Sequence, residues 1–166
     1  DRTHDLIVWG APGPERDRRK AEKRPLLQKT ISSELGSVTP VLIVPGSFSD
    51  SELQFVAENV ATMVANNGSF NCNAAKMLVT SRHWPQRQDF LRRVEAALRT
   101  VPLRKAYYPG AHERYNTLLE GQRDVIRIGS PQPEELAWAL VWGVDPSKTD
   151  DKLFKIEPFC GMLSET

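Results

Sequence analysis

The sequence predicts an α/β fold: a three-layer domain with a mostly parallel sheet. Short apolar runs typical of buried strands alternate with amphipathic stretches of helical spacing. Apolar residues make up 40% of the 166 residues and charged residues 26%, which is the balance of a globular domain with a buried core. No internal repeat or low-complexity segment divides the chain, so residues 1–166 are predicted to form a single domain.

The first third of the chain is predicted to hold strands and one helix. Residues 6–9, Leu-Ile-Val-Trp, predict a buried strand that Gly10 ends. The charged stretch 15–24 predicts a solvated helix, and residues 26–33 predict a second strand. Residues 41–44, Val-Leu-Ile-Val between prolines, are the clearest buried strand of the sequence.

Two strong helices follow. Ser49 or Asp50 is expected to cap the first, which ends at Asn-Asn-Gly, residues 66–68. Its apolar stripe has helical spacing and comprises Leu53, Val56, Val60, Met63 and Val64. Pro85 is expected to start the second helix, whose inner face comprises Phe90, Leu91, Val94, Ala97 and Leu98.

The remaining elements are shorter. Residues 101–109 hold two prolines and predict a loop, and residues 112–120 predict a helix. Apolar runs predict strands at 76–80, 125–128, 138–142 and 153–156.

The composition argues against several classes of function. A net charge of +1 gives no field that would favour nucleic acid or an anionic membrane, and no apolar stretch is long enough to span one. Two cysteines far apart indicate reduced thiols in a cytoplasmic protein. With three scattered histidines they form no metal-ligand spacing, so no metal is expected.

Cys72 is a candidate nucleophile. It lies in a polar loop between a predicted helix and a predicted strand, with Asn71 and Asn73 beside it. A nucleophilic thiol must be reachable and must form a thiolate, and a polar loop with a conformationally free Gly68 suits both needs. The alternative is a small buried thiol that only packs.

Two acidic residues are further candidates. Glu34 lies between predicted strands, close to Ser33 and Gly36, which are small enough to let a ligand approach the backbone. A partly buried carboxylate at a strand end would serve as a general base. Glu157 precedes a Pro-Phe-Cys-Gly segment. Taken singly, each acid is also explained as a surface charge.

The order of these motifs resembles the aldehyde dehydrogenase superfamily. Residues 33–40, Ser-Glu-Leu-Gly-Ser-Val-Thr-Pro, are similar to the family's Glu-Leu-Gly-Gly-Lys-Ser-Pro segment, and residues 66–72, Asn-Asn-Gly-Ser-Phe-Asn-Cys, to its Asn-x-Gly-Gln-x-Cys loop. Residues 153–159, Leu-Phe-Lys-Ile-Glu-Pro-Phe, resemble its Phe-x-Glu-Glu-x-Phe-Gly-Pro signature. Residues 7–11, Ile-Val-Trp-Gly-Ala, resemble its Phe-Thr-Gly-Ser cofactor turn. The likeness covers nearly the whole chain.

The resemblance implies NAD(P)-dependent oxidation of an aldehyde to a carboxylic acid. Cys72 would attack the aldehyde carbon, and the loop that includes Asn71 would hold the oxyanion. Hydride would pass to NAD or NADP, and a water activated by Glu34 would hydrolyse the thioester. By the same resemblance Glu157 holds the nicotinamide ribose and Phe159 packs by the nicotinamide.

The resemblance also implies what lies outside this chain. Gly10 and Gly36 are implied cofactor-binding positions, but the family binds its dinucleotide mainly on a separate domain, and no Gly-rich fingerprint of such a domain occurs here. Residues 1–166 thus resemble a partial catalytic domain that is inactive alone. The full-length protein is expected to be a cytoplasmic homodimer or homotetramer.

Departures from the family motifs support a second hypothesis. Trp9 stands where the cofactor turn carries Thr. An ungapped alignment from Gly68 to Lys76 places Asn71 at the nucleophile position and Cys72 one residue later, and a one-residue shift of the loop would restore Cys72. The alternative is a catalytically inactive aldehyde-dehydrogenase-like module for oligomerisation or binding.

Overall fold

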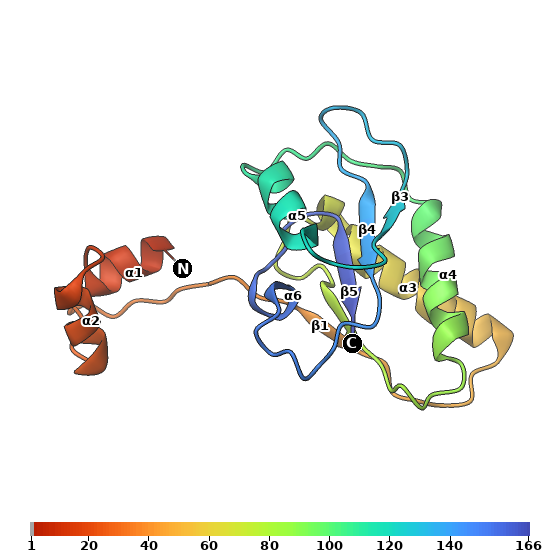
Figure 1. Cartoon of the computed structure of the whole chain (residues 1–166), viewed down its shortest axis with the longest axis horizontal. Coiled ribbons are helices and arrows are strands. Elements are labelled where there is room, and N and C mark those ends of the chain that lie inside the picture. Colours follow the sequence, from red (N-terminus) through yellow and green to blue (C-terminus); the bar gives the residue numbers. More distant parts are fainter. Residues whose placement is uncertain (1) are drawn as a thin grey trace. The chain divides into compact units, whose positions relative to one another are not determined.

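A computed structural model describes residues 2–166 (Figure 1). The chain divides into two compact units, Asp1–Gly36 and Ser37–Thr166, and each is described by itself. The expectation of a single domain over residues 1–166 stays a prediction. Among the described residues, no helix has the length and apolar character needed to cross a membrane.

The first unit contains two short helices, α1 (Arg2–Trp9) and α2 (Pro14–Ala21). The strand predicted at residues 6–9 is wrong, because these residues form the last turns of α1. Gly10, at φ +94°, ends this helix and donates its N–H to the Leu6 carbonyl at 3.1 Å. The helix predicted at 15–24 is confirmed as α2, which buries no side chain.

The second unit contains a five-stranded sheet in the order β1-β2-β5-β4-β3. All neighbouring strands are parallel except β3 and β4, which are antiparallel. The strands are β1 (Pro40–Leu42), β2 (Met77–Val79), β3 (Ile126–Ile128), β4 (Trp138–Val141) and β5 (Met162–Glu165). The predicted α/β class with a mostly parallel sheet is therefore confirmed.

Several strand predictions need correction. Residues 26–33 form no strand. Residues 153–156 lie mainly in α6 (Lys152–Lys155), because the Asp151 side chain caps this helix by accepting from the Leu153 N–H at 2.9 Å. The run at 41–44 contributes only part of β1, an edge strand, and Leu42 is 68% exposed, so the prediction of a buried strand there is wrong. The strands predicted at 76–80, 125–128 and 138–142 are confirmed with shorter bounds.

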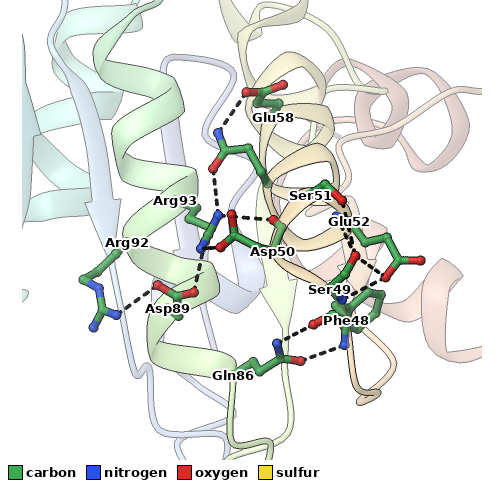
Figure 2. Close-up of polar contacts among 11 residues, drawn as sticks. Phe48, Ser49, Asp50, Ser51, Glu52, Glu58, Gln86, Asp89, Arg92 and Arg93 are labelled. Atoms are coloured by element: carbon green, nitrogen blue, oxygen red, sulfur yellow. Dashed lines mark hydrogen bonds and ion pairs between the residues drawn. The ribbon is translucent and has the colours of Figure 1, made fainter.

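The helices α3 (Asp50–Ala65) and α4 (Arg87–Arg99) pack against each other. Ser49 caps α3 in a capping box with Glu52. Figure 2 shows the polar contacts between the two helices, in which Arg93 of α4 bonds Asp50 of α3. The predicted stripe of α3 is confirmed at Leu53, Val60 and Val64, whereas Met63 is 38% exposed.

Two apolar clusters on opposite faces of the sheet give the fold its three layers. Leu78, Leu140 and Leu163 belong to the cluster of α3 and α4. Met77 and Met162, next to them along their strands, belong to the cluster of α5 (Ala111–Leu119). Successive strand residues point to opposite faces, so helices cover both sides of the sheet (Figure 1).

Candidate functional site

The parallel strands β2 and β5 bring two of the predicted motifs to one edge of the sheet. Residues 66–76, here called the Cys72 loop, precede β2, and the segment with Glu157 and Phe159 precedes β5. Neighbouring parallel strands start at the same edge. The rings of Phe70 and Phe159, with centroids 6.5 Å apart, join the two segments.

Cys72 lies at the surface of its loop, exposed to solvent. Its thiol faces Asn73 Oδ1 at 3.9 Å, and its carbonyl oxygen accepts a 2.6 Å hydrogen bond from the Thr39 hydroxyl. The Thr39 carbonyl in turn accepts from the backbone N–H of Lys76 at 3.0 Å. The loop is thus fixed to the residue that precedes β1, while the thiol stays accessible.

The side chain of Asn71 shapes this loop from within. Its amide nitrogen donates to the side-chain oxygen of Asn66 at 2.6 Å, and its oxygen accepts from the Ala74 N–H at 2.5 Å. Both ends of the carboxamide therefore have partners inside the loop.

Three consecutive residues of the Cys72 loop have left-handed backbone conformations. The φ angle is 50° at Asn67, 63° at Gly68 and 70° at Ser69. Glycine adopts this conformation without steric cost and asparagine tolerates it, whereas serine pays about 1–2 kcal/mol. A Cβ at Gly68 would also lie 3.2 Å from the Phe70 ring. Backbone strain of this kind collects at functional sites.

Sequence reasoning missed Lys76, the residue that closes this loop. It is only 1% exposed, and its Nζ donates to the carbonyl oxygen of Ser69 at 2.6 Å and to the Ser69 hydroxyl at 2.8 Å. Burial lowers the pKa of Lys76 to about 8, while the acidic groups of Cys160, Glu157 and Cys72 act to raise it. A lysine at the head of an apolar strand was the available signal, because a buried lysine is rare without partners.

Glu157 and Arg114 each carry a buried polar atom that lacks a hydrogen-bond partner among the described residues. These atoms are Glu157 Oε1 and Arg114 Nη2. The Arg114 Nε donates to the Pro158 carbonyl at 2.8 Å, which places the guanidinium beside the same segment. Unsatisfied buried polar atoms are uncommon, and here they indicate a place for a polar ligand or water.

An aromatic cluster adjoins the Cys72 loop. The ring of Phe159 packs against Tyr108 with centroids 4.5 Å apart, and Phe70 packs against Tyr107 at 4.8 Å. Phe159 has a positive φ of 44°, which is strained for an aromatic residue. Phe70 lies two positions before Cys72, so this apolar cluster lies next to the loop that carries the thiol.

A pocket of about 490 Å³ borders the left-handed turn. Its lining comprises Ala65, Asn67, Gly68, Arg104, Lys105 and Tyr107. The Asn67 amide donates to the Tyr107 hydroxyl at 3.0 Å across this lining. Its volume is within the range of small-molecule sites.

The second thiol is of a different kind. Cys160 is fully buried, and burial raises its pKa to about 11. It therefore stays a neutral thiol near pH 7 and packs in the core on the α5 side of the sheet. Among the described residues, no group of three His, Cys, Asp or Glu side chains is arranged to hold a metal.

Three predicted site residues lie in the first unit. Glu34 and Gly36 are exposed in its extended segment, and Gly10 ends α1. They belong to a different unit from Cys72. Their roles as general base and cofactor contacts stay predictions.

Comparison with solved structures decides the fold family. No family model matches the chain, and no curated protein matches it in sequence. The NAD-dependent aldehyde dehydrogenase from Sinorhizobium meliloti matches 93% of the chain with a TM-score of 0.65 and 18% identity. The chain has an aldehyde dehydrogenase fold. The NAD-dependent benzaldehyde dehydrogenase from Corynebacterium glutamicum matches 89% of it, with a TM-score of 0.66 and 16% identity.

A third similar structure is the NADP-dependent glyceraldehyde-3-phosphate dehydrogenase from Bacillus halodurans C-125, complexed with NADP. It matches 80% of the chain with a TM-score of 0.64 and 14% identity. The chain spans only 29%, 32% and 34% of the Bacillus, Sinorhizobium and Corynebacterium proteins. The resemblance noted from the motifs is thus confirmed for the fold, over a fragment of these enzymes.

Proposed function

We propose that this chain is part of an NAD(P)-dependent aldehyde dehydrogenase that oxidises an aldehyde to a carboxylic acid, with Cys72 as the nucleophile. One observation carries the proposal. An exposed thiol lies on a strained polar loop, at the sheet edge that also holds Glu157 and Phe159, in a fold shared with solved aldehyde dehydrogenases.

The Cys72 loop suits a covalent mechanism. The thiolate would add to the aldehyde carbon and give a tetrahedral adduct with a negative oxygen. The Cys72 backbone N–H has no acceptor among residues 2–166, so it is free to donate to this oxyanion. Loss of hydride from the adduct leaves a thioester on Cys72, which water hydrolyses to the acid.

Glu34 is the proposed general base for that hydrolysis. It lies five positions before Thr39, whose hydroxyl holds the Cys72 carbonyl. A carboxylate brought near the thioester would take a proton from the attacking water and restore the free thiol. Gly36 and Gly10 are proposed to leave room for the cofactor near this segment.

The segment before β5 fits a nicotinamide cofactor. The unpartnered Oε1 of Glu157 would accept from a ribose hydroxyl, and the nicotinamide would pack beside the ring of Phe159 in the aromatic cluster. NAD or NADP, when bound, accepts the hydride. The similar glyceraldehyde-3-phosphate dehydrogenase from Bacillus halodurans C-125 is complexed with NADP.

The proposal extends to the whole protein. Most of the dinucleotide would bind to parts of the enzyme beyond this fragment, and we expect a homodimer or homotetramer. Both cysteines are free thiols, as they are in proteins of a reducing compartment such as the cytoplasm.

The test is production of NADH or NADPH by the intact protein from a panel of aldehydes. Cys72→Ala should lower turnover by about a thousandfold or more, because the covalent step is lost. Ser147→Ala, at an exposed position, is the control and should stay within about twofold of the wild type. Normal turnover by Cys72→Ala would overturn the role of the thiol.

A second candidate function is favoured by Asn71. It occupies the third position after Gly68, where the family carries its cysteine, and its carboxamide is fully used inside the loop. This arrangement fits an inactive module for oligomerisation or binding. Absence of turnover with every aldehyde and both cofactors, in a folded intact protein, would decide for this candidate.

A further inference from the structure

The left-handed turn of the Cys72 loop needs an external support. Asn67, Gly68 and Ser69 all have positive φ, and Ser69 is the member least suited to it. Ser69 is also fully buried, so water cannot satisfy its carbonyl or its hydroxyl. Some group of the protein must therefore bind both atoms of Ser69.

Lys76 supplies that support from the start of β2. Its Nζ donates to both oxygens of Ser69, at 2.6 and 2.8 Å. Its backbone N–H donates to Thr39, which also binds the Cys72 carbonyl. Lys76 therefore connects two parts of the loop. It holds the left-handed turn at Ser69, and it binds Thr39, whose hydroxyl donates to the Cys72 carbonyl.

The charge of Lys76 fits the same task. The ammonium is almost fully buried, and the acidic groups around it are Glu157 and Cys160, from the segment before β5, and Cys72 in the loop itself. Hydrogen bonds from a charged donor are shorter and stronger than neutral ones.

We propose that Lys76 is the positioning residue of the Cys72 loop: its buried ammonium clamps Ser69 in the left-handed turn and keeps the Cys72 thiol presented at the surface. The inference deepens the proposed function and rests on it for the use of the thiol. Its test measures the loop and the thiol directly, so it is independent of whether aldehyde turnover is found.

The first measurement is hydrogen exchange of the amides of residues 67–70 in the intact protein, where the Phe70 N–H donates to the Asn67 carbonyl at 3.1 Å. Lys76→Met keeps the length of the side chain but loses the donors, and should raise exchange by roughly tenfold or more. Lys76→Arg keeps a charged donor and should recover part of the protection. Lys155→Met, an exposed lysine on α6, is the matched control and should change nothing.

The second measurement is the rate at which iodoacetamide alkylates Cys72, followed by peptide mass spectrometry. Lys76→Met should change the alkylation rate of Cys72 by about threefold or more near pH 7, because the loop no longer holds the thiol in one position. The gap from the wild type should narrow as the pH rises through about 8, where Lys76 itself becomes neutral. A residue that only fills space would not give this pH profile.

A double variant tests the conformational part of the clamp. Ser69→Gly removes the cost of the left-handed conformation, so in the Lys76→Met background it should restore part of the slow exchange. If Lys76→Met does not fold, Ser69→Ala tests the clamp alone, since it deletes one of the two acceptors and should raise exchange. The proposal is overturned if, in folded variants at Lys76 and Ser69, the amide exchange rates and the alkylation rate of Cys72 both stay within about twofold of the wild type.

Discussion

The Thr39 hydroxyl donates a 2.6 Å hydrogen bond to the carbonyl oxygen of Cys72. Thr39 belongs to the segment that enters β1, and Cys72 belongs to the loop that enters β2. The two strands are parallel neighbours, so the bond joins the segments at the edge where they begin. The backbone of the candidate nucleophile is therefore fixed by a side chain 33 positions earlier in the sequence.

Loss of this hydrogen bond should loosen the loop. Thr39→Val keeps the shape of the side chain and removes the donor, so the free energy of unfolding should fall by about 1 kcal/mol. Thr39→Ser keeps the hydroxyl and should lose less. Urea unfolding of both variants measures the difference, and equal losses would show that the methyl group matters rather than the hydrogen bond.

The capping box of α3 gives a second prediction. Ser49→Ala removes the acceptor of the Glu52 N–H and should lower the free energy of unfolding by about 1 kcal/mol. Ser47→Ala, at an exposed position just before the helix, is the control.

The effect of Ser49→Ala should depend on pH. Hydrogen bonds from Ser49 lower the pKa of Glu52 below its ordinary 4.5, so the ionised carboxylate stabilises the fold above that pH. This contribution is lost as the pH falls through the lowered pKa. The difference between wild type and variant should thus shrink in acid, and a constant difference from neutral to acidic pH would contradict the role of Glu52.

A buried ion pair closes the carboxyl end of the sheet. Glu165 is fully buried and accepts from Arg87 Nη2 at 2.6 Å, from Arg87 Nε at 2.8 Å and from the Gly143 N–H at 2.9 Å. Glu165→Gln leaves the Arg87 charge without its partner and should lower the free energy of unfolding by roughly 3 kcal/mol. Glu113→Gln, at an exposed site on α5, should cost almost nothing. A loss below about 0.5 kcal/mol for Glu165→Gln would show that water reaches Arg87 in place of the carboxylate.

The long helices and the central strands could be predicted from sequence because their patterns are strong. Leu53, Val60 and Val64 repeat at helical spacing behind a serine cap, and tertiary packing agrees with that pattern. The resemblance implied that Cys72 and Glu157 serve one site. Parallel pairing of β2 and β5 brings their two segments close together, and the roles of the two residues stay predictions.

Short segments could not be predicted reliably. The apolar run at 6–9 is as typical of a helix as of a strand. The hydrogen bond from the Gly10 N–H to the Leu6 carbonyl shows that these residues end a helix. β5 was missed because half of it is polar: Ser164 and Glu165 are buried, and Glu165 is paired with Arg87, 78 positions away. Lys76 was missed as a site residue because its partners, the carbonyl and hydroxyl oxygens of Ser69, come close to it only when the loop is folded.

Burial of Lys76 predicts how stability depends on pH. The folded state lowers its pKa from 10.5 to about 8, with Cys160, Glu157 and Cys72 as the acidic groups that face it. At Lys76 the unfolded chain then binds more protons between these pH values, so the contribution of Lys76 to stability rises with pH across this window, whereas the raised pKa of Cys160 acts in the opposite direction above about pH 9. The gain corresponds to about 3 kcal/mol at most. Lys76→Met should lack this rise, and parallel curves for wild type and variant in urea unfolding from pH 7 to 10.5 would contradict the shift.

The two cysteines should differ in reactivity while the protein is folded. Cys72 is exposed, whereas Cys160 is buried and its pKa is raised to about 11, so it remains a neutral thiol at ordinary pH. Iodoacetamide near pH 8 should therefore modify Cys72 alone, and both thiols in urea. Peptide mass spectrometry at timed intervals measures each site. Modification of Cys160 at a rate close to that of Cys72 in the native protein would show that the segment before β5 opens readily, and that the packing around Glu157 and Phe159 is not stable enough to hold a cofactor in place.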